Sequence, residues 1–165
     1  MIQSKTIPAI YVGTYAKYNN GSINGAWLSL TGYQNSADFY KACKELHNDE
    51  PDPEFMFQDF EGFPEKLYSE SGGINEIYEY LDFIDGQNEN AVCAFLTAYD
   101  IKDLKYFEIS YNGEWKSEID FAYHFIESHY NLEGILSNYF DYEKYARHLF
   151  SDGYCFVDGY VFSDF

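Results

Sequence analysis

The sequence predicts an α+β fold, an elongated chain of three small modules that follow one another. Stretches rich in β-branched and aromatic residues occur towards both ends, stretches with apolar residues at helical spacing lie beside them, and turn signals separate the two kinds. We expect residues 1–61 to form an antiparallel sheet with one helix and residues 62–104 a helical middle domain. Residues 105–165 are expected to form a C-terminal α+β domain.

The first module should contain a hairpin and a third strand. Residues 9–15 (AIYVGTY) and 25–30 (GAWLSL) have strand composition, and the turn-rich segment 17–21 lies between them. A short helix follows from Ser36, the expected cap, to His47, because Phe39, Tyr40, Cys43 and Leu46 recur at helical spacing. In residues 54–60 (EFMFQDF) Phe55 and Phe57 alternate with Met56 and Gln58, as expected of a strand. The module is therefore expected to be a small sheet with a helix.

The middle module should be helical. In residues 74–85, Ile74, Ile77, Leu81 and Ile84 share one face, which is typical of an amphipathic helix. A different face carries Glu76, Glu79 and Asp82, so this helix presents a ladder of like charge. Residues 88–99 read as a second apolar helix, and residues 100–104 as a short turn or helix.

The third module should be mixed. Residues 105–111 (KYFEISY) resemble a strand ended by the turn pair Asn112-Gly113. Ser117 should begin a helix with an apolar stripe that runs from Phe121 to Tyr130, and Asp141 should cap another helix that ends at Phe150. Two strands, 154–157 and 160–162, flank Asp158-Gly159, the strongest hairpin signal in the sequence.

Acidity is the dominant property of the chain. It has 28 acidic and 10 basic residues, a formal net charge of −18. The stretch from Glu45 to Glu89 holds fourteen acids and one basic residue, Lys66, and no positive side chain occurs between Lys66 and Lys102. Like charges three residues apart on a helix repel by about 0.2 to 0.5 kcal/mol per pair. Because 46% of the residues are hydrophobic and 21% aromatic, the chain should nevertheless fold, and its acidity belongs to a folded surface.

The totals also exclude function classes. A nucleic-acid binder needs clustered basic residues, whereas the ten here are scattered singly. The three cysteines lie in separate segments and cannot make a complete disulfide framework, which favours a reducing, cytoplasmic setting. No run approaches the length of a membrane span, and the N-terminus has no apolar signal region.

Catalytic and metal motifs are not evident. There is no nucleophile elbow, phosphate-binding loop, dinucleotide fingerprint or C-x-x-C pair. His124 and His129 are five residues apart, not the four that would place two ligands on one helical face. Two alternatives remain open: a cation or calcium site at residues 49–52 (DEPD), and a carboxylate-dependent hydrolase, which would need two facing acids. We expect no enzyme activity and no cofactor.

Spaced carboxylates can imitate phosphates, although a simple solvated acidic face is the alternative. Duplex DNA carries one negative charge per roughly 1.7 Å of axis, so a dimer with 36 net charges matches about 60 Å of duplex. The candidate phosphate-mimicking residues are Asp49, Glu50, Asp52, Glu54, Asp59, Glu61, Glu65, Glu70, Glu76, Glu79, Asp82, Asp85, Glu89, Asp103, Glu108, Glu114, Glu118, Asp120 and Glu127.

Short motifs at both ends carry a family resemblance. The residues Ile10-Tyr11-Val12-Gly13, then Lys17-Tyr18-Asn19, Gly21 and Gly25-Ala26-Trp27 resemble the opening signature of the ArdA-type antirestriction proteins. The similarity continues through Gln58-Asp59-Phe60 and the acidic middle. Residues 132–145 (LEGILSNYFDYEKY) resemble the antirestriction motif of that family, through Leu132, Leu136, Tyr139, Phe140 and Asp141. The chain departs from the family pattern in its high tyrosine and phenylalanine content and in an extension at residues 4–8.

The resemblance implies a protein of three modules in series that dimerises through the C-terminal module and imitates bent B-form DNA. Such a homodimer would occupy the DNA-binding groove of the methyltransferase core of a type I restriction-modification enzyme. It would block restriction of incoming mobile DNA, with inhibition of modification left open, and would need neither catalysis nor a cofactor. We expect no nucleic-acid or membrane partner. The strand at residues 106–111 is the candidate dimer seam, because an edge strand has unpaired backbone groups.

Overall fold

The structure is a computed structural model that describes residues 6–132 and 134–165. Its internal contacts group the chain into two compact units, Met1–Asp85 and Gly86–Phe165, called unit 1 and unit 2 below. Each unit holds a three-stranded antiparallel sheet with helices, which confirms the α+β class. The boundaries of the three modules stay a prediction. Residues 4 and 5 of the N-terminal extension lie outside the described residues.

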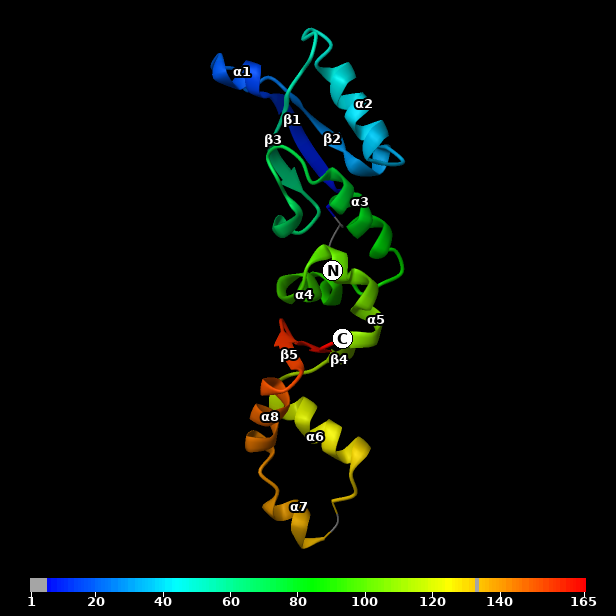
Figure 1. Cartoon of the computed structure of the whole chain (residues 1–165), viewed down its shortest axis with the longest axis vertical. Coiled ribbons are helices and arrows are strands. Elements are labelled where there is room, and N and C mark those ends of the chain that lie inside the picture. The colour runs from blue at the N-terminus through cyan, green and yellow to red at the C-terminus, as the bar shows by residue number, and fades with distance from the viewer. Residues whose placement is uncertain (1–5, 133) are drawn as a thin grey trace. The chain divides into compact units, whose positions relative to one another are not determined.

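Unit 1 is built on a sheet with strand β1 (Ala9–Thr14) at its centre (Figure 1). Strands β2 (Ala26–Ser29) and β3 (Phe55–Glu61) pair with it on either side, both antiparallel. The predicted hairpin is therefore confirmed, but its connection contains a short helix, α1 (Tyr15–Asn19). This helix forms because the Thr14 hydroxyl accepts a hydrogen bond from Lys17 N at 3.2 Å and so caps its first turn.

Helix α2 (Ser36–Leu46) covers one face of this sheet. Its Phe39 and Cys43 are fully buried, and the Phe39 and Phe57 rings lie 6.2 Å apart between centroids. The cap is Asn35, whose side-chain oxygen accepts from Asp38 N at 3.0 Å, so the expected cap Ser36 was wrong by one residue. An amide oxygen caps as well as a hydroxyl does, and the sequence offers both side by side. Two short 3₁₀ turns, η1 (Leu30–Gly32) and η2 (Glu65–Leu67), flank the sheet.

Helix α3 (Ile74–Phe83) ends unit 1. Ile74 and Ile77 are buried as predicted, and Tyr80, which the apolar pattern missed, is fully buried as well, while Leu81 is half-buried. Tyrosine takes this position because its ring fills the core as phenylalanine would. The predicted charged face is confirmed as exposed at Glu76, Glu79 and Asp82.

Unit 2 has the strand order β4-β6-β5, with β4 (Tyr111–Glu114), β5 (Tyr154–Val157) and β6 (Tyr160–Ser163). The predicted hairpin of β5 and β6 is confirmed. Its two connecting residues, Asp158 and Gly159, have φ angles of 51° and 89°, the left-handed pair that a tight hairpin turn requires. Helix α4 (Glu89–Ala98) packs against this hairpin and buries Val92, Phe95 and Leu96.

The predicted strand at residues 105–111 was wrong. The chain there forms the 3₁₀ helix η3 (Ile101–Tyr106) and the short helix α5 (Phe107–Ser110), and strand β4 begins only at Tyr111. Buried residues recur every third position, at Leu104, Phe107 and Ser110, whereas Ile109, which an alternating strand would bury with Phe107, is 71% exposed. The expected turn Asn112-Gly113 lies inside β4, where the register with β6 is irregular.

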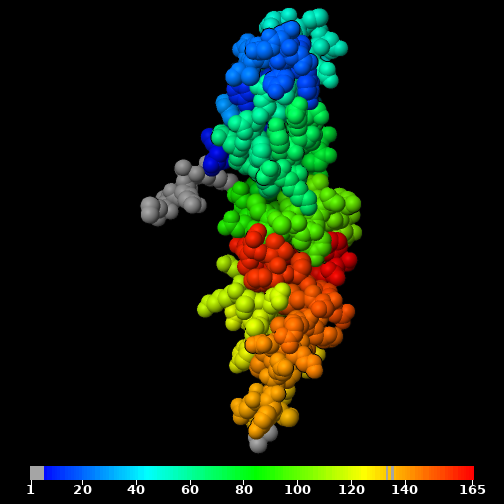
Figure 2. All heavy atoms as spheres, turned by 90° about the vertical axis from the view of Figure 1, so that its left-hand side faces the viewer, coloured from blue at the N-terminus to red at the C-terminus, as the bar shows by residue number. Residues whose placement is uncertain are grey.

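Helices complete unit 2 around a core of Phe121, Ala122, Ala146, Leu149 and Val161. Helix α6 (Glu118–His129) begins at Ser117, whose hydroxyl accepts from Asp120 N at 3.1 Å, and helix α8 (Tyr142–Ser151) begins at Asp141. Both caps were predicted. Between them lies α7 (Ile135–Tyr139). Figure 2 shows α8, in orange, directly beside the red β5–β6 hairpin, consistent with their packing contacts.

Candidate functional site: an acidic surface

The predicted phosphate-mimicking acids lie at the surface. Of the nineteen, sixteen are exposed, and the three that are partly buried are Glu50, Glu89 and Asp103. They are spread over both units. In unit 1 they follow α2 (Asp49, Glu50, Asp52, Glu54), lie on β3 and η2 (Asp59, Glu61, Glu65), and continue through Glu70, Glu76, Glu79, Asp82 and Asp85. In unit 2 they are Glu89, Asp103, Glu108, Glu114, Glu118, Asp120 and Glu127.

Local structure explains why these carboxylates point outward. On β3 the exposed Asp59 and Glu61 alternate with the half-buried Phe60, as side chains of a half-buried strand do, and the irregular register with β1 between Asp59 and Phe57 returns Phe57 to the buried face. On α3 the exposed Glu76 and Glu79 lie away from the face that buries Ile77. The periods of strand and helix thus hold the acids on the solvent side wherever the opposite side enters a core.

The charge is divided equally between the units. Each unit has fourteen acidic and five basic residues, a net charge of −9 on each. Neither unit is therefore a neutral scaffold for an acidic partner domain. Both units therefore contribute acidic surface.

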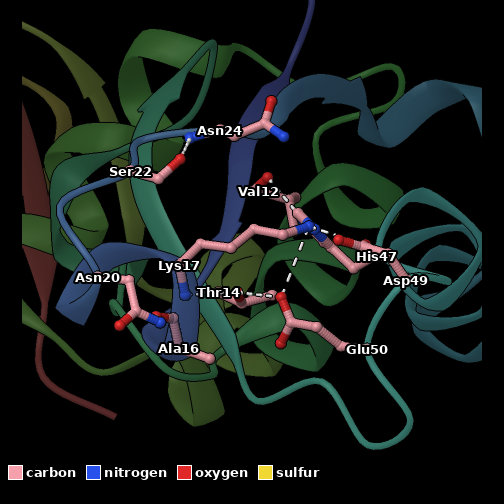
Figure 3. A network of polar contacts seen from close by, with 10 residues as sticks. All are labelled: Val12, Thr14, Ala16, Lys17, Asn20, Ser22, Asn24, His47, Asp49 and Glu50. Carbon is pink, nitrogen blue, oxygen red and sulfur yellow. Dashed lines mark hydrogen bonds and ion pairs between the residues drawn. The ribbon is translucent and has the colours of Figure 1, made fainter.

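A polar network around Lys17 pairs two of these acids with a cation (Figure 3). The Lys17 ammonium lies 2.9 Å from Asp49 Oδ1 and 3.5 Å from Glu50 Oε1, and it donates a hydrogen bond to His47 Nδ1 at 2.9 Å. The Thr14 hydroxyl donates to Glu50 Oε1 at 2.7 Å. An ammonium group has no acceptor, so His47 Nδ1 must be unprotonated, and Nε2–H then donates to the Val12 carbonyl at 3.1 Å.

This network ties α1 to the chain that follows α2. His47 is 1% exposed, and its ring joins the sheet carbonyl of Val12 to Lys17. The hydrogen bond between Lys17 and Asp49 raises the pKa of Lys17 and lowers the pKa of Asp49. Asp49 and Glu50 therefore already share a cation, which reduces the charge they can offer a partner.

The same network bears on the calcium alternative. Ligand atoms of His47, Asp49 and Glu50 lie within 4.8 Å of one another, close enough to surround one metal ion. Lys17 Nζ, however, is bonded to all three residues. A calcium ion also prefers six to eight oxygen ligands over an imidazole nitrogen, so this cluster fits an internal lysine better than calcium.

The hydrolase alternative requires two facing carboxylates. A shallow hollow beside α2 is lined by Asp38 and Glu45 together with Tyr33, Lys41 and Ala42. Its two acids are seven residues apart on one helix, about 10 Å along the axis, so they flank the hollow and do not face each other across it. This arrangement does not resemble a pair of catalytic acids.

A family model described as "Antirestriction protein (ArdA)" matches residues 10–162. The chain belongs to the ArdA antirestriction family. The match covers nearly the whole sequence, so both units fall within it. ArdA is a family of inhibitor proteins and not of enzymes. The sequence matched no curated protein. Within the described residues, no helix has both the length and the apolar character needed to cross a membrane.

The C-terminal residues that resemble the antirestriction motif combine exposed apolar and capping residues. Leu136 and Tyr139 of α7 are 66% and 83% exposed, whereas Leu132 and Phe140 are half-buried. Asp141 has a structural role, because its Oδ1 accepts from Lys144 N at 2.9 Å and caps α8. The motif-like residues therefore do not form one core cluster. Residue 133 of this stretch lies outside the described residues.

Tyrosines that interact with the acids were not anticipated from sequence. A hydrogen bond to Glu70 raises the pKa of Tyr15, and one to Glu127 raises the pKa of Tyr123. Both phenols therefore lie close to a surface carboxylate. The signal in the sequence was the high tyrosine content of an acidic chain, which this ArdA protein uses partly for such contacts.

Proposed function

We propose that this antirestriction protein inhibits type I restriction-modification enzymes by imitating B-form DNA. The observation that carries the proposal is the exposure of sixteen of the nineteen candidate acids, spread over two units of −9 each, in a chain that matches the ArdA family. A groove that holds duplex DNA is lined with basic residues that pair with the regularly spaced phosphates of the backbone. The exposed acids of both units would supply such charges without any nucleic acid.

Binding in such a groove has a clear electrostatic consequence. Both DNA and the inhibitor would pair with the same cations, so their occupancy would be mutually exclusive and both affinities would fall as salt rises. Single carboxylates would matter little, because an exposed ion pair contributes about 0 to 1 kcal/mol. The inhibitor would protect incoming mobile DNA by keeping the enzyme from it.

The test is a DNA cleavage assay with a purified type I enzyme, combined with competition between the protein and a labelled duplex. We expect cleavage to stop at saturating inhibitor, and the inhibitor and the duplex to displace each other with an affinity that falls steeply between 50 and 200 mM salt, conditions over which roughly 10³-fold losses are seen for multi-phosphate contacts. Undiminished cleavage at saturating protein would reject the proposal. Methylation of the same duplex, measured in parallel, tests whether modification is also blocked.

We also infer a homodimer that forms through unit 2. The exposed Leu136 and Tyr139 support it, because apolar side chains this accessible are common where a second protein surface covers them. The segment 106–111 no longer offers a strand for this purpose, since it is helical up to Ser110. A dimer would carry 36 net negative charges, equivalent to about 60 Å of duplex.

Sedimentation equilibrium of two variants tests this interface. Tyr139→Asp should yield monomers, because it adds a charge to the contact. Ile109→Asp, another strongly exposed apolar position in the same unit, should leave the dimer intact. A wild-type monomer at all concentrations, or a dimer that only Ile109→Asp disrupts, would contradict the inference.

A further inference from the structure

The open face of the unit 1 sheet carries a row of three side chains, one from each strand. Tyr11 of β1 pairs with Trp27 of β2 on one side and with Asp59 of β3 on the other. Residues that pair directly across antiparallel strands point to the same face, so the three side chains form a line across the sheet. With strands about 4.8 Å apart, Trp27 and Asp59 are separated by about 10 Å between backbones.

This face is opposite the one that packs on α2. The next pair in the β1–β3 register, Val12 with Phe57, illustrates the contrast: both residues are buried, and Phe57 contacts Phe39 of α2. Phe57 lies two residues before Asp59, and the register shift between Tyr11 and Val12 turns it to the opposite face. In the row itself Trp27 is 45% exposed, and Asp59 is exposed as well. An indole this accessible on a strand contributes little to the core, so its presence calls for another explanation.

The row is held in a fixed geometry. The Tyr11 and Trp27 rings make an edge-to-face pair with 5.6 Å between centroids, and the Tyr11 hydroxyl donates to the Ile23 carbonyl at 3.1 Å. Asp59 Oδ1 accepts from Phe60 N at 2.8 Å, which orients the carboxylate. Both the aromatic pair and the carboxylate are therefore arranged before any ligand arrives, which lowers the entropy lost on binding.

We propose that Trp27, Tyr11 and Asp59 form a docking site for an arginine side chain of the partner protein. A guanidinium stacks on aromatic rings and donates two parallel hydrogen bonds to a carboxylate, so a row of rings ending in a carboxylate complements it along its length. Lysine fits less well because its ammonium is compact and strongly hydrated. The exposed Glu61, two residues from Asp59 on the same strand, adds to the attraction for a cation.

This inference rests on the proposed function and makes it more specific. Phosphate imitation distributes the binding energy over many weak pairs, whereas tryptophan and tyrosine are frequent among the few residues that dominate protein–protein affinity. The row would supply such an anchor in unit 1. It would also distinguish the inhibitor from DNA, because it engages an arginine by its flat face and not only by its charge.

Competition against duplex DNA on a purified type I enzyme is the first test. We expect Trp27→Ala to weaken the inhibitor at least tenfold without changing the slope of affinity against salt, because no charge is removed. Asp59→Asn should weaken it by a similar factor, whereas the matched control Asp38→Asn, an exposed acid of unit 1 outside the candidate phosphate-mimicking set, should change affinity less than threefold. Trp27→Phe keeps a ring and should lie between, and circular dichroism checks that each variant is folded.

A second measurement needs no restriction enzyme. Tri-arginine should quench the fluorescence of the wild-type protein more strongly than tri-lysine at matched ionic strength, and this difference should vanish in Trp27→Phe. Equal quenching by the two peptides, or folded Trp27→Ala and Asp59→Asn variants that match Asp38→Asn, would overturn the docking site. If the wild-type protein fails to compete with DNA at all, the proposed function fails, and the peptide comparison then decides on the site alone.

Discussion

At the scale of single residues, Lys17 shows how an acidic chain uses one of its few cations. Its ammonium contacts Asp49, Glu50 and His47, and its backbone N–H is bound by Thr14. The sequence shows Lys17 only as part of a turn-rich, family-like signature. Its partners lie 30 to 33 residues further on, so no local pattern could have paired them.

The pH dependence of stability should report this pair. The pKa of Asp49 lies below its usual 3.8, so its contribution is present above that value and is lost as pH falls through the lowered pKa. The pKa of Lys17 lies above its usual 10.5, so its contribution is lost only as pH rises through the raised pKa. Asp49→Asn should lower the urea midpoint modestly at pH 7, and the difference from wild type should shrink at pH 3. The control Asp52→Asn should show no such change in difference.

Cys43 should not react with thiol reagents in the folded protein. Burial raises its pKa to about 12, and its side chain is fully buried against the sheet of unit 1, whereas Cys93 and Cys155 are only partly buried. With a thiol reagent at pH 8, Cys43 should react only after denaturation, because the thiolate is the reacting form. The Cys43→Ser variant should give the same native titration as wild type and one thiol fewer when unfolded. A native titration that loses a thiol in this variant would contradict the assignment.

At the scale of elements, charge and stability oppose each other on α3. Glu76, Glu79 and Asp82 follow one another at three-residue spacing on its exposed face, and each adjacent pair should cost about 0.2 to 0.5 kcal/mol. The triple variant Glu76→Gln, Glu79→Gln, Asp82→Asn should therefore raise the free energy of unfolding by up to about 1 kcal/mol and weaken inhibition of DNA cleavage. Chemical denaturation and the cleavage assay measure the two effects. A variant that gains stability and keeps full potency would show that α3 does not contact the enzyme.

Elements with a strong local signal were predictable from sequence. The pair Asp158-Gly159 predicted the β5–β6 hairpin, and the N-cap residues predicted where α6 and α8 begin. The strand prediction for residues 105–111 failed because the sequence KYFEISY fits a strand period of two as well as a helical period of three. Only the burial of Leu104 and Ser110 decides between the two periods. That burial comes from tertiary packing, which the local sequence does not contain.

The candidate site was predictable in part for the same reason. The apolar residues of β3 and α3 predict that the acids beside them face solvent, and sixteen of the nineteen candidate acids are exposed, while their role as phosphate mimics stays a prediction. The Lys17 network and the row of Trp27, Tyr11 and Asp59 were not foreseen, because both depend on strand register and on contacts between distant segments. Composition alone does not distinguish core aromatic residues from exposed ones such as Trp27 and Tyr139.

At the scale of the whole molecule, self-repulsion should make stability depend on salt. Each unit carries a net charge of −9, and at 0.15 M ionic strength charges further apart than about 8 Å are largely screened. Thermal midpoints should therefore rise when sodium chloride increases from 0.01 to 0.3 M. Over the same range the affinity for a restriction enzyme should fall, so the two quantities should move in opposite directions. A midpoint that falls with salt would indicate that net attraction, and not repulsion, governs the fold.

The acids on β3 have a further consequence, for aggregation. Strand β3 is an edge of its sheet, and such edges recruit strands of other chains unless they are covered or charged. Phe57 N already donates to the Glu70 carbonyl, which covers part of this edge, and the exposed Asp59 and Glu61 lie further along it. A variant that neutralises Asp59 or Glu61 therefore removes a charge that opposes β-pairing between molecules. Light scattering should accompany every activity measurement on such variants, since lost inhibition and lost monodispersity would otherwise be confused.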